Sequence, residues 1–199
     1  MKKILLMAIA IMMIPMITFA ENFVVDLAAS SKTIESNLAV MMEVTNGQIL
    51  SAGGGITVID HDEKIINGKI LMKGKEAAPG FQYGVGLKWL GSDKIGYDEG
   101  KDYELNALGL LFAIEYDMLA LPGSSKAPVV ITAEVSGAPS SLCFEDAKSY
   151  IDAKVRASVY VLPNALIFVQ VSYYKIKFED NPEFKFRDSD MFLGVSFQF

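Results

Sequence analysis

The chain has 199 residues, which predicts a single domain, and its 18 basic and 24 acidic residues give a net charge of −6. This balance argues against a basic nucleic-acid-binding surface, so we expect no nucleic-acid partner. Cys143 is the single cysteine, which excludes an intramolecular disulfide and a cysteine-rich metal site. We expect Cys143 to be a packed loop residue rather than a reactive thiol.

The first twenty residues have the pattern of a secretory signal peptide. Two lysines precede the apolar run Ile4–Ile14, and small residues at a cleavage site end at Ala20. The run ends at a proline after eleven residues, fewer than the roughly 20 that a spanning helix needs, which disfavours an uncleaved anchor. We therefore predict a signal peptide at 1–20 and one mature domain at 21–199, with a net charge of 16 − 24 = −8.

The mature sequence alternates apolar and polar residues in short segments separated by turn residues, as antiparallel barrels do. Ten strands are predicted: Phe23–Ala28, Ile34–Val44, Ile49–Asp60, Ile66–Lys75, Phe81–Leu90, Tyr103–Tyr116, Pro128–Gly137, Lys148–Val161, Ala165–Phe178 and Met191–Phe199. The fourth strand has an ambiguous start, because Asn67-Gly68 is itself a turn signal. If the short first strand does not pair with the last, the number falls below ten, and eight is the alternative.

Connections between the predicted strands alternate in character. Turn-like segments are Asn46-Gly47, Glu76–Gly80, Met118–Ala127 and Pro163-Asn164, and longer charged segments are His61–Ile65, Gly91–Asp102, Ala138–Ala147 and Glu179–Arg187. Transmembrane barrels have short periplasmic turns and long external loops, and an even strand number places both termini in the periplasm. The acidic excess of the long segments indicates either simple solvation, cation-mediated contact with lipopolysaccharide, or repulsion of anionic solutes.

Alternation alone does not tell whether the apolar face points to lipid or into a soluble barrel. The polar face is rich in small residues that suit a narrow lumen: Gly53, Gly55, Gly84, Gly86, Gly109, Gly194, Ser158, Ser172 and Ser196. Aromatic residues lie near strand ends on the apolar face, as in an interfacial girdle: Phe81, Trp89, Tyr116, Tyr173 and Phe199. We therefore predict an all-β, antiparallel up-and-down transmembrane β-barrel in the outer membrane of a Gram-negative bacterium.

The last strand places Leu193, Val195, Phe197 and Phe199 on its lipid-facing side and ends on an aromatic residue. This pattern resembles the closing strand of bacterial outer-membrane barrels, where it serves as the assembly signal. The resemblance implies the barrel-assembly machinery as a partner, beside outer-membrane lipid and lipopolysaccharide. We expect this strand to pair with Ala165–Phe178 and, to close the barrel, with Phe23–Ala28.

The predicted lumen carries charges of both signs: Glu43, Lys73, Lys88, Glu115, Glu134, Asp152, Lys154 and Arg156. A hairpin centred on Phe144 would set Glu134 across from Asp152, Lys154 and Arg156. Paired charges would plug a dry lumen, whereas unpaired ones would line a narrow conduit for small polar solutes. Ten strands leave little room, and the mixed signs argue against strong ion selectivity.

Several short motifs recur together in the carboxyl-terminal part, from Pro128 to Phe199. They are Ala138-Pro139-Ser140-Ser141-Leu142, the alternating strand Tyr150–Tyr160, Pro163-Asn164, Tyr173-Tyr174-Lys175-Ile176, and Asp188 before Gly194-Val195-Ser196-Phe197. With these motifs the chain resembles the YfaZ family of outer-membrane proteins. The ninth strand departs from that family, because Ser172-Tyr173-Tyr174 stands where the family prefers Gly-Tyr-Arg. The resemblance implies a small outer-membrane barrel and supplies no catalytic residues.

Catalytic and metal-binding sets are poorly supported. His61 is the only histidine and lies in the acidic segment Asp60-His61-Asp62-Glu63, which we interpret as a solvated loop. One histidine without a cysteine partner makes a weak metal site. No spacing in the sequence indicates a nucleophile within hydrogen-bond reach of this histidine. We predict no catalytic residue, cofactor or metal. The expected function is a structural or interaction barrel with a charge-paired lumen. The alternatives are a narrow channel for small polar solutes and an outer-membrane hydrolase centred on His61.

Overall fold

A computed structural model describes residues 22–44, 47–59, 63–74, 76–98, 101–121, 127–179 and 185–199. The predicted signal peptide, Asn46, His61 and the Pro122-Gly123 turn lie outside these residues. Within the described ranges, no helix is long and apolar enough to cross a membrane.

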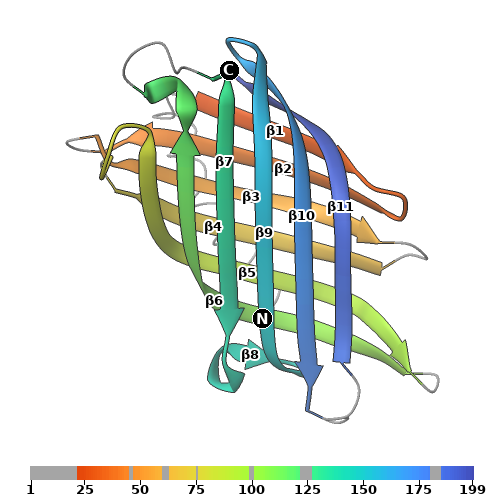
Figure 1. The fold of residues 1–199 in the computed structure, drawn as a ribbon. Helices are drawn as coiled ribbons and strands as arrows, with labels where there is room; N and C mark the ends of the chain where they lie inside the picture. Colours follow the sequence, from red (N-terminus) through yellow and green to blue (C-terminus); the bar gives the residue numbers. More distant parts are fainter. Residues whose placement is uncertain are drawn as a thin grey trace.

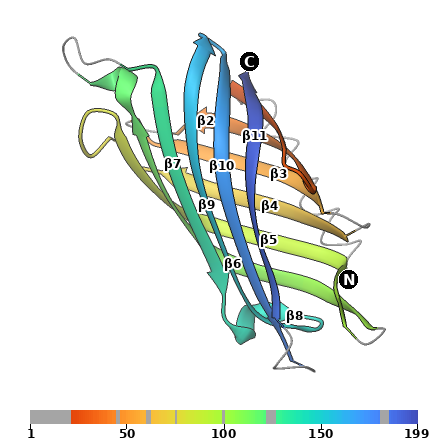
Figure 2. The ribbon, with the colours of Figure 1, turned by 45° about the vertical axis from the view of Figure 1, so that its right-hand side comes forward.

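Ten antiparallel strands form a closed barrel in which neighbours along the chain are neighbours in space (Figures 1 and 2). They are β1 (Asn22–Ala29), β2 (Thr33–Glu43), β3 (Ile49–Ile59), β4 (Glu63–Lys73), β5 (Phe81–Asp98), β6 (Lys101–Asp117), β7 (Val129–Ala138), β9 (Ala147–Leu162), β10 (Ala165–Phe178) and β11 (Lys185–Gln198). The two-residue strand β8 (Cys143–Phe144) pairs with β6 outside this ring and directly follows the short helix η3 (Ser140–Leu142). The other short helix, η2 (Met118–Ala120), follows β6 at the opposite end of the barrel (Figure 1). The predicted up-and-down barrel of ten strands is confirmed.

The first and last strands close the ring. β1 and β11 pair from Val24↔Gln198 to Ala29↔Leu193. The backbone N–H of Phe199 donates to the carbonyl oxygen of Phe23 over 2.8 Å, and the N–H of Phe23 donates to Phe199 over 2.9 Å. The short first strand therefore pairs as predicted, and the alternative of eight strands is wrong.

The predicted loop Gly91–Asp102 is wrong, because most of it belongs to a long hairpin of β5 and β6. Pairing continues through Ile95↔Tyr103 to Asp98↔Lys101, with register shifts on both sides of Ile95. A bulge inserts an unpaired residue and so interrupts the period of two from which a strand is recognised in sequence. The bulge brings Ile95 to the inside, where its side chain is 1% exposed.

The start of β4 also differs from the prediction. Asn67 and Gly68 form no turn there; they are extended and pair with Gly55 and Gly54 of β3. β4 therefore begins at Glu63, and Ile65, predicted in a loop, is fully buried. The segment Glu179–Arg187 is shorter than predicted as well, because β11 starts at Lys185.

The apolar face of each strand points outward. On β6, Leu110 and Phe112 are both 54% exposed, whereas the intervening Leu111 is 1% exposed. The predicted girdle residues also take outward positions, with Phe81 beside Tyr116 at one level and Trp89 eight residues further along β5. Eight residues of strand span roughly 26 Å, which a tilt of about 40° shortens to roughly 20 Å along the membrane normal, slightly less than the apolar band of a membrane barrel. The barrel therefore has the construction of a protein that sits in lipid.

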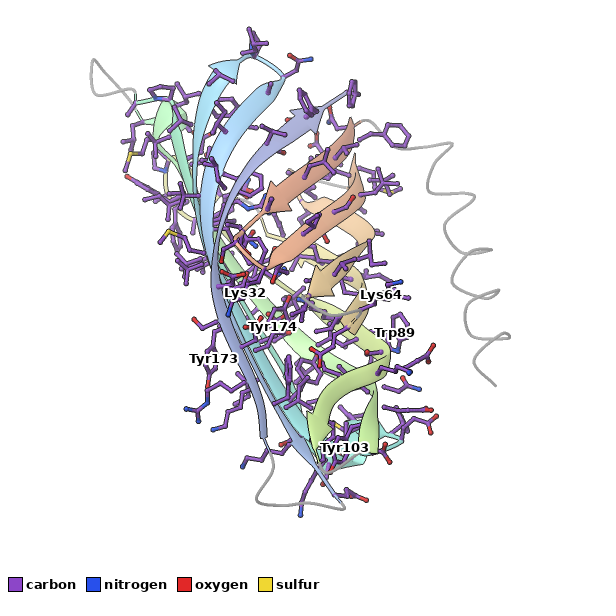
Figure 3. All side chains as sticks on the ribbon, turned by 90° about the vertical axis from the view of Figure 1, so that its right-hand side faces the viewer. Lys32, Lys64, Trp89, Tyr103, Tyr173 and Tyr174 are labelled. Atoms are coloured by element: carbon purple, nitrogen blue, oxygen red, sulfur yellow. The ribbon has the colours of Figure 1, made fainter. Side chains whose placement is uncertain are left out.

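This polarity reverses towards the end of the barrel where β10 ends. The outward positions of β10 are apolar up to Tyr173 and then become Lys175 and Lys177, whereas the buried inward ones are Tyr174, Ile176 and Phe178. Figure 3 shows Tyr173 pointing away from the barrel and Tyr174 pointing into it. Beyond the level of Tyr173 the barrel is thus built like a water-soluble domain, with an apolar core and a polar surface.

The lumen as candidate functional site

Five ion pairs lie in the lumen, in the polar half of the barrel. They are Lys69–Glu134 at 2.7 Å, Lys73–Glu115 at 2.6 Å, Lys154–Glu35 at 2.6 Å, Arg156–Asp26 at 2.7 Å, and Lys88–Asp152. In every pair the two residues come from strands that are not neighbours in the ring. The side chains of four pairs therefore reach across the lumen, whereas Lys73 and Glu115 meet over the single strand β5. Positive and negative charges balance one to one.

β9 contributes three of these charges, because Asp152, Lys154 and Arg156 alternate along it and so share its inner face. Their partners lie on β5, β2 and β1 respectively. The backbone register of the β7–β9 hairpin is the predicted one, with Glu134 opposite Lys154. Glu134 nevertheless pairs with Lys69 of β4, so the partners come from across the barrel.

Glu43 stands apart from the other predicted lumen charges. It is exposed at the end of β2, and its carboxylate accepts a hydrogen bond of 3.1 Å from the backbone N–H of Gly47. Its position in the alternation of β2 faces the lumen, but as the last residue of the strand it lies at the rim of the barrel. Glu43 therefore caps a turn and takes no part in the ion pairs across the lumen.

The deepest ion pairs are nearly dry. The side chains of Lys88 and Asp152 are 4% and 3% exposed, and the Ser136 hydroxyl also donates to Asp152 over 3.2 Å. Glu35, equally buried, accepts from Lys154 and also from the amides of Asn37 and Gln170, over 2.7 and 3.3 Å. Buried charges are tolerated only when they are paired and hydrogen-bonded in this way.

Arg156 joins the charged and aromatic parts of the lumen. It donates to Asp26 over 2.7 Å and twice to the Gln170 side-chain oxygen, over 3.1 and 2.8 Å. Its guanidinium carbon lies 3.9 Å from the centre of the Phe168 ring, a distance suited to a cation–π contact. The guanidinium is thereby held by a carboxylate, an amide and an aromatic ring.

Two of the predicted lumen glycines make room for large inward side chains. A Cβ at Gly194 would lie 2.4 Å from the ring of Phe168, and one at Gly109 would lie 2.1 Å from the hydroxyl of Tyr150. Tyr150 donates from that hydroxyl to the carbonyl of Lys88 over 3.1 Å. These small residues therefore let the lumen fill with side chains and do not leave it empty.

An apolar cluster fills the barrel at the end that carries the β5–β6 hairpin and β8, the lower end in Figure 1. It consists of Ile65, Leu90, Ile95, Tyr103, Leu105, Ala107, Ala138, Ala147, Tyr150, Ile176 and Phe178. The rings of Tyr103 and Phe178 stack at 4.4 Å between centroids. We name this set the apolar plug, since its members are buried and come from six consecutive strands of the ring, β4 to β7, β9 and β10.

The polar half encloses a cavity of about 370 Å³. Its lining includes the ion-paired residues except Asp152 and, nearer the carboxyl terminus of the chain, Ser158, Tyr160, Gln82 and Gln198. The cavity is partly open to solvent there, and the apolar plug lies beyond its other end. In this conformation the lumen is a blind pocket lined by both polar and apolar side chains.

Sequence reasoning missed Asp26, Glu35, Lys69 and Gln170 as members of the lumen network. The alternation pattern does mark these positions as inward, as for Asp26, which stands between the outward residues Val25 and Leu27. What sequence could not supply is the pairing across the barrel, since Glu35 and Lys154 are 119 residues apart.

Metal or nucleophilic chemistry finds no support in the part of the chain that the structure describes. No group of three or more His, Cys, Asp or Glu side chains gathers there, and the hydrolase alternative rests on His61, which lies outside it. Cys143 is partly buried in β8, and its thiol points to the carbonyl of Ala138 at 3.8 Å. Burial raises the pKa of the Cys143 thiol, which disfavours the reactive thiolate.

No family model matches the chain, and no curated protein sequence matches it. Among solved structures, the chain is similar to the outer membrane channel DcaP of Acinetobacter baumannii, with 10% identity and a TM-score of 0.46 over 87% of this chain and 54% of that one. It is also similar to Pseudomonas aeruginosa OccK1 (OpdK), with 15% identity and a TM-score of 0.40 over 90% and 53% of the two chains. A structure of OpdK with vanillate gives the same identity and score over 90% and 52%. The chain thus spans about half the length of these proteins, and likeness at this level assigns it neither a substrate nor an activity.

Proposed function

We propose that this chain is an integral outer-membrane β-barrel of a Gram-negative bacterium with no catalytic role and a closed lumen. The observation that carries the proposal is the distribution of polarity, with apolar side chains on the outside and paired charges within. A lipid-facing Lys or Arg costs roughly 2–4 kcal/mol near the bilayer midplane, so the charges stay inside and the apolar face meets lipid. The signal-peptide pattern at 1–20 supports export, and the YfaZ resemblance stays a prediction.

The proposed role is that of a structural or interaction barrel, because solute passage meets two successive obstacles. The ion pairs Lys88–Asp152 and Lys154–Glu35 cross the middle of the lumen, and the apolar plug lies beyond them. Parting a buried ion pair leaves unpaired charges in a dry interior, which is costly.

A narrow channel for small polar solutes is the second candidate. The cavity of about 370 Å³ favours it, because polar and charged side chains are part of its lining and it is large enough for a small solute. Passage would require the apolar plug and the buried ion pairs to move. The balanced charges of the lining would give little ion selectivity.

The two candidates differ in current across a planar bilayer. Refolded, purified protein is first checked for heat-modifiable migration on a gel, which reports the folded barrel. The closed barrel is expected to give no steady single-channel current and no uptake of small solutes into liposomes. A steady current would overturn the closed lumen and favour the channel.

We also propose that the last strand is read by the barrel-assembly machinery. Leu193, Phe197 and Phe199 expose their side chains outward, and Val195 is partly exposed on the same face. A Phe199→Ala variant is expected to refold in detergent but to accumulate less in the outer-membrane fraction of cells. Met191→Ala, on the same strand face, is the control; equal loss with both variants would contradict a specific role of the terminal residue.

A further inference from the structure

The outward apolar side chains of the barrel, such as Val169 and Val171 on β10, form what we call the apolar belt. Just beyond this belt, the outer surface of β10 and β11 carries basic side chains. On β10, Lys175 and Lys177 follow Tyr173 at the next two outward positions, and on β11 Arg187 lies directly opposite Lys175. Lys177 and Arg187 are exposed, and Lys175 is partly exposed. We call Lys175, Lys177 and Arg187 the basic patch.

The basic patch is electrostatically unsatisfied within the described residues. Like charges directly opposite each other across two strands repel, as Lys175 and Arg187 must. None of the three side chains forms an ion pair with another described residue. Glu179, the first residue after β10, lies further along the chain from the apolar residues of the strand than the patch does. An anion bound at the patch would relieve this repulsion.

A surface hollow of about 290 Å³ lies beside the patch. It is lined by Gly137 of β7, Ser149 and Ile151 of β9, and both Lys175 and Lys177. Ile151 is 51% exposed and continues the apolar belt, and Gly137 has no side chain to fill the hollow. The hollow therefore joins an apolar floor to two ammonium groups, which suits an amphipathic ligand with an anionic head.

The depth of the patch matches lipid headgroups. Lys175 and Lys177 lie two and four residues beyond Tyr173, or roughly 7 and 13 Å along the strand. The headgroup layer is several ångströms thick outside the hydrocarbon core, and tilt shortens these distances along the membrane normal. On the β5–β6 hairpin, by contrast, the exposed Asp93 and Lys94 have opposite signs.

We propose that the hollow and the basic patch bind a phosphate-bearing lipid headgroup of the external leaflet, the chemistry that lipopolysaccharide presents. The inference rests on the proposed function, because periplasmic termini place the β10–β11 connection on the external side. Lysine and arginine make strong charge-assisted hydrogen bonds to phosphate oxygens. The acyl part of the lipid then lies along Ile151 and the outward valines of β9 below it.

The test measures binding of lipopolysaccharide, with and without its phosphate groups, to the refolded barrel in neutral detergent micelles. The wild type is expected to prefer the phosphorylated lipid. The triple variant Lys175→Gln, Lys177→Gln, Arg187→Gln is expected to lose about fivefold per charge, or roughly a hundredfold at low salt. The matched control, Lys32→Gln with Lys64→Gln, removes two other exposed lysines and is expected to keep the preference.

Wild-type affinity in the triple variant, or an equal loss in the control, would overturn the inference. Displacement of the lipid by inorganic phosphate at a similar concentration would assign the patch to free phosphate and overturn the lipid. If the triple variant fails to show heat-modifiable migration, Lys177→Gln alone must still lose about fivefold. A folded barrel without lipid preference contradicts only this inference, whereas failure to enter liposomes contradicts the proposed function.

Discussion

Lys88 and Asp152 show how a single inward position is constrained in this barrel. Both side chains are almost fully buried, and Asp152 accepts from Lys88 and from Ser136. Removing one partner of a buried ion pair leaves an uncompensated charge, whereas replacing both partners by apolar groups is often tolerated. The two residues should therefore be strongly coupled.

Asp152→Ala and Lys88→Met are each expected to lower the free energy of unfolding by about 3–5 kcal/mol, because each leaves a buried charge unpaired. The double variant Lys88→Met, Asp152→Leu is expected to recover most of this loss. The free energy of unfolding is measured by urea unfolding in micelles, monitored by the fluorescence of the single tryptophan, Trp89. Lys69→Met is the control, because its pair is 27% and 21% exposed and its loss should be clearly smaller. Additive losses in the double variant would contradict the coupling.

At the scale of one element, β9 combines a charged inner face with an outer face of exposed valines. Its strict alternation allowed its bounds to be predicted to within one residue, and β10 matches its predicted bounds at both ends. β5 and β4 were less predictable. The bulge near Ile95 breaks the alternation of β5, and Asn67-Gly68 looks like a turn until β3 pairs with it. Local periodicity fails where pairing with a neighbour overrides it.

The outer face of β9 predicts a dependence on depth in the membrane. Val155 and Val161 are 54% and 52% exposed, but Val155 lies mid-strand and Val161 near the Pro163-Asn164 turn. Val155→Lys is expected to cost about 2–4 kcal/mol and Val161→Lys about 0–1 kcal/mol, because the cost of a lipid-facing cation falls towards the interface. Unfolding of the two variants in lipid vesicles measures the difference. Equal costs would contradict the proposed position of the belt.

The whole molecule is closed twice, by the ring of strands and by the contents of the lumen. The ring depends on β1 and β11 meeting, and the lumen depends on ion pairs and on the apolar plug. The plug also explains why β6 is apolar on both faces. Its inward Tyr103 and Leu105 belong to the plug, and its outward Leu110 and Phe112 belong to the belt.

Opening the lumen is expected to need changes both in the apolar plug and in the ion pairs. Tyr103→Ala with Phe178→Ala removes the aromatic stack of the plug but should give no steady current, because ion pairs still cross the lumen. Adding serine at both members of the Lys88–Asp152 and Lys154–Glu35 pairs should produce a current in planar bilayers. Heat-modifiable migration verifies that each variant is folded. A current from the first variant alone would show that the ion pairs do not block the pore.

The sequence by itself predicted the antiparallel up-and-down barrel and the two faces of each strand, because these follow from a period of two that is repeated along the chain. The number of ten strands was decided by the pairing of β1 with β11. The charged residues of β9 were likewise visible as inward positions. Only the tertiary structure decided which charges pair, since partners such as Lys154 and Glu35 meet across the lumen between distant strands. It also decided that the lumen is blind and that a basic hollow lies beside the belt. Both depend on side chains that the closing of the ring brings together, and no local pattern encodes that meeting.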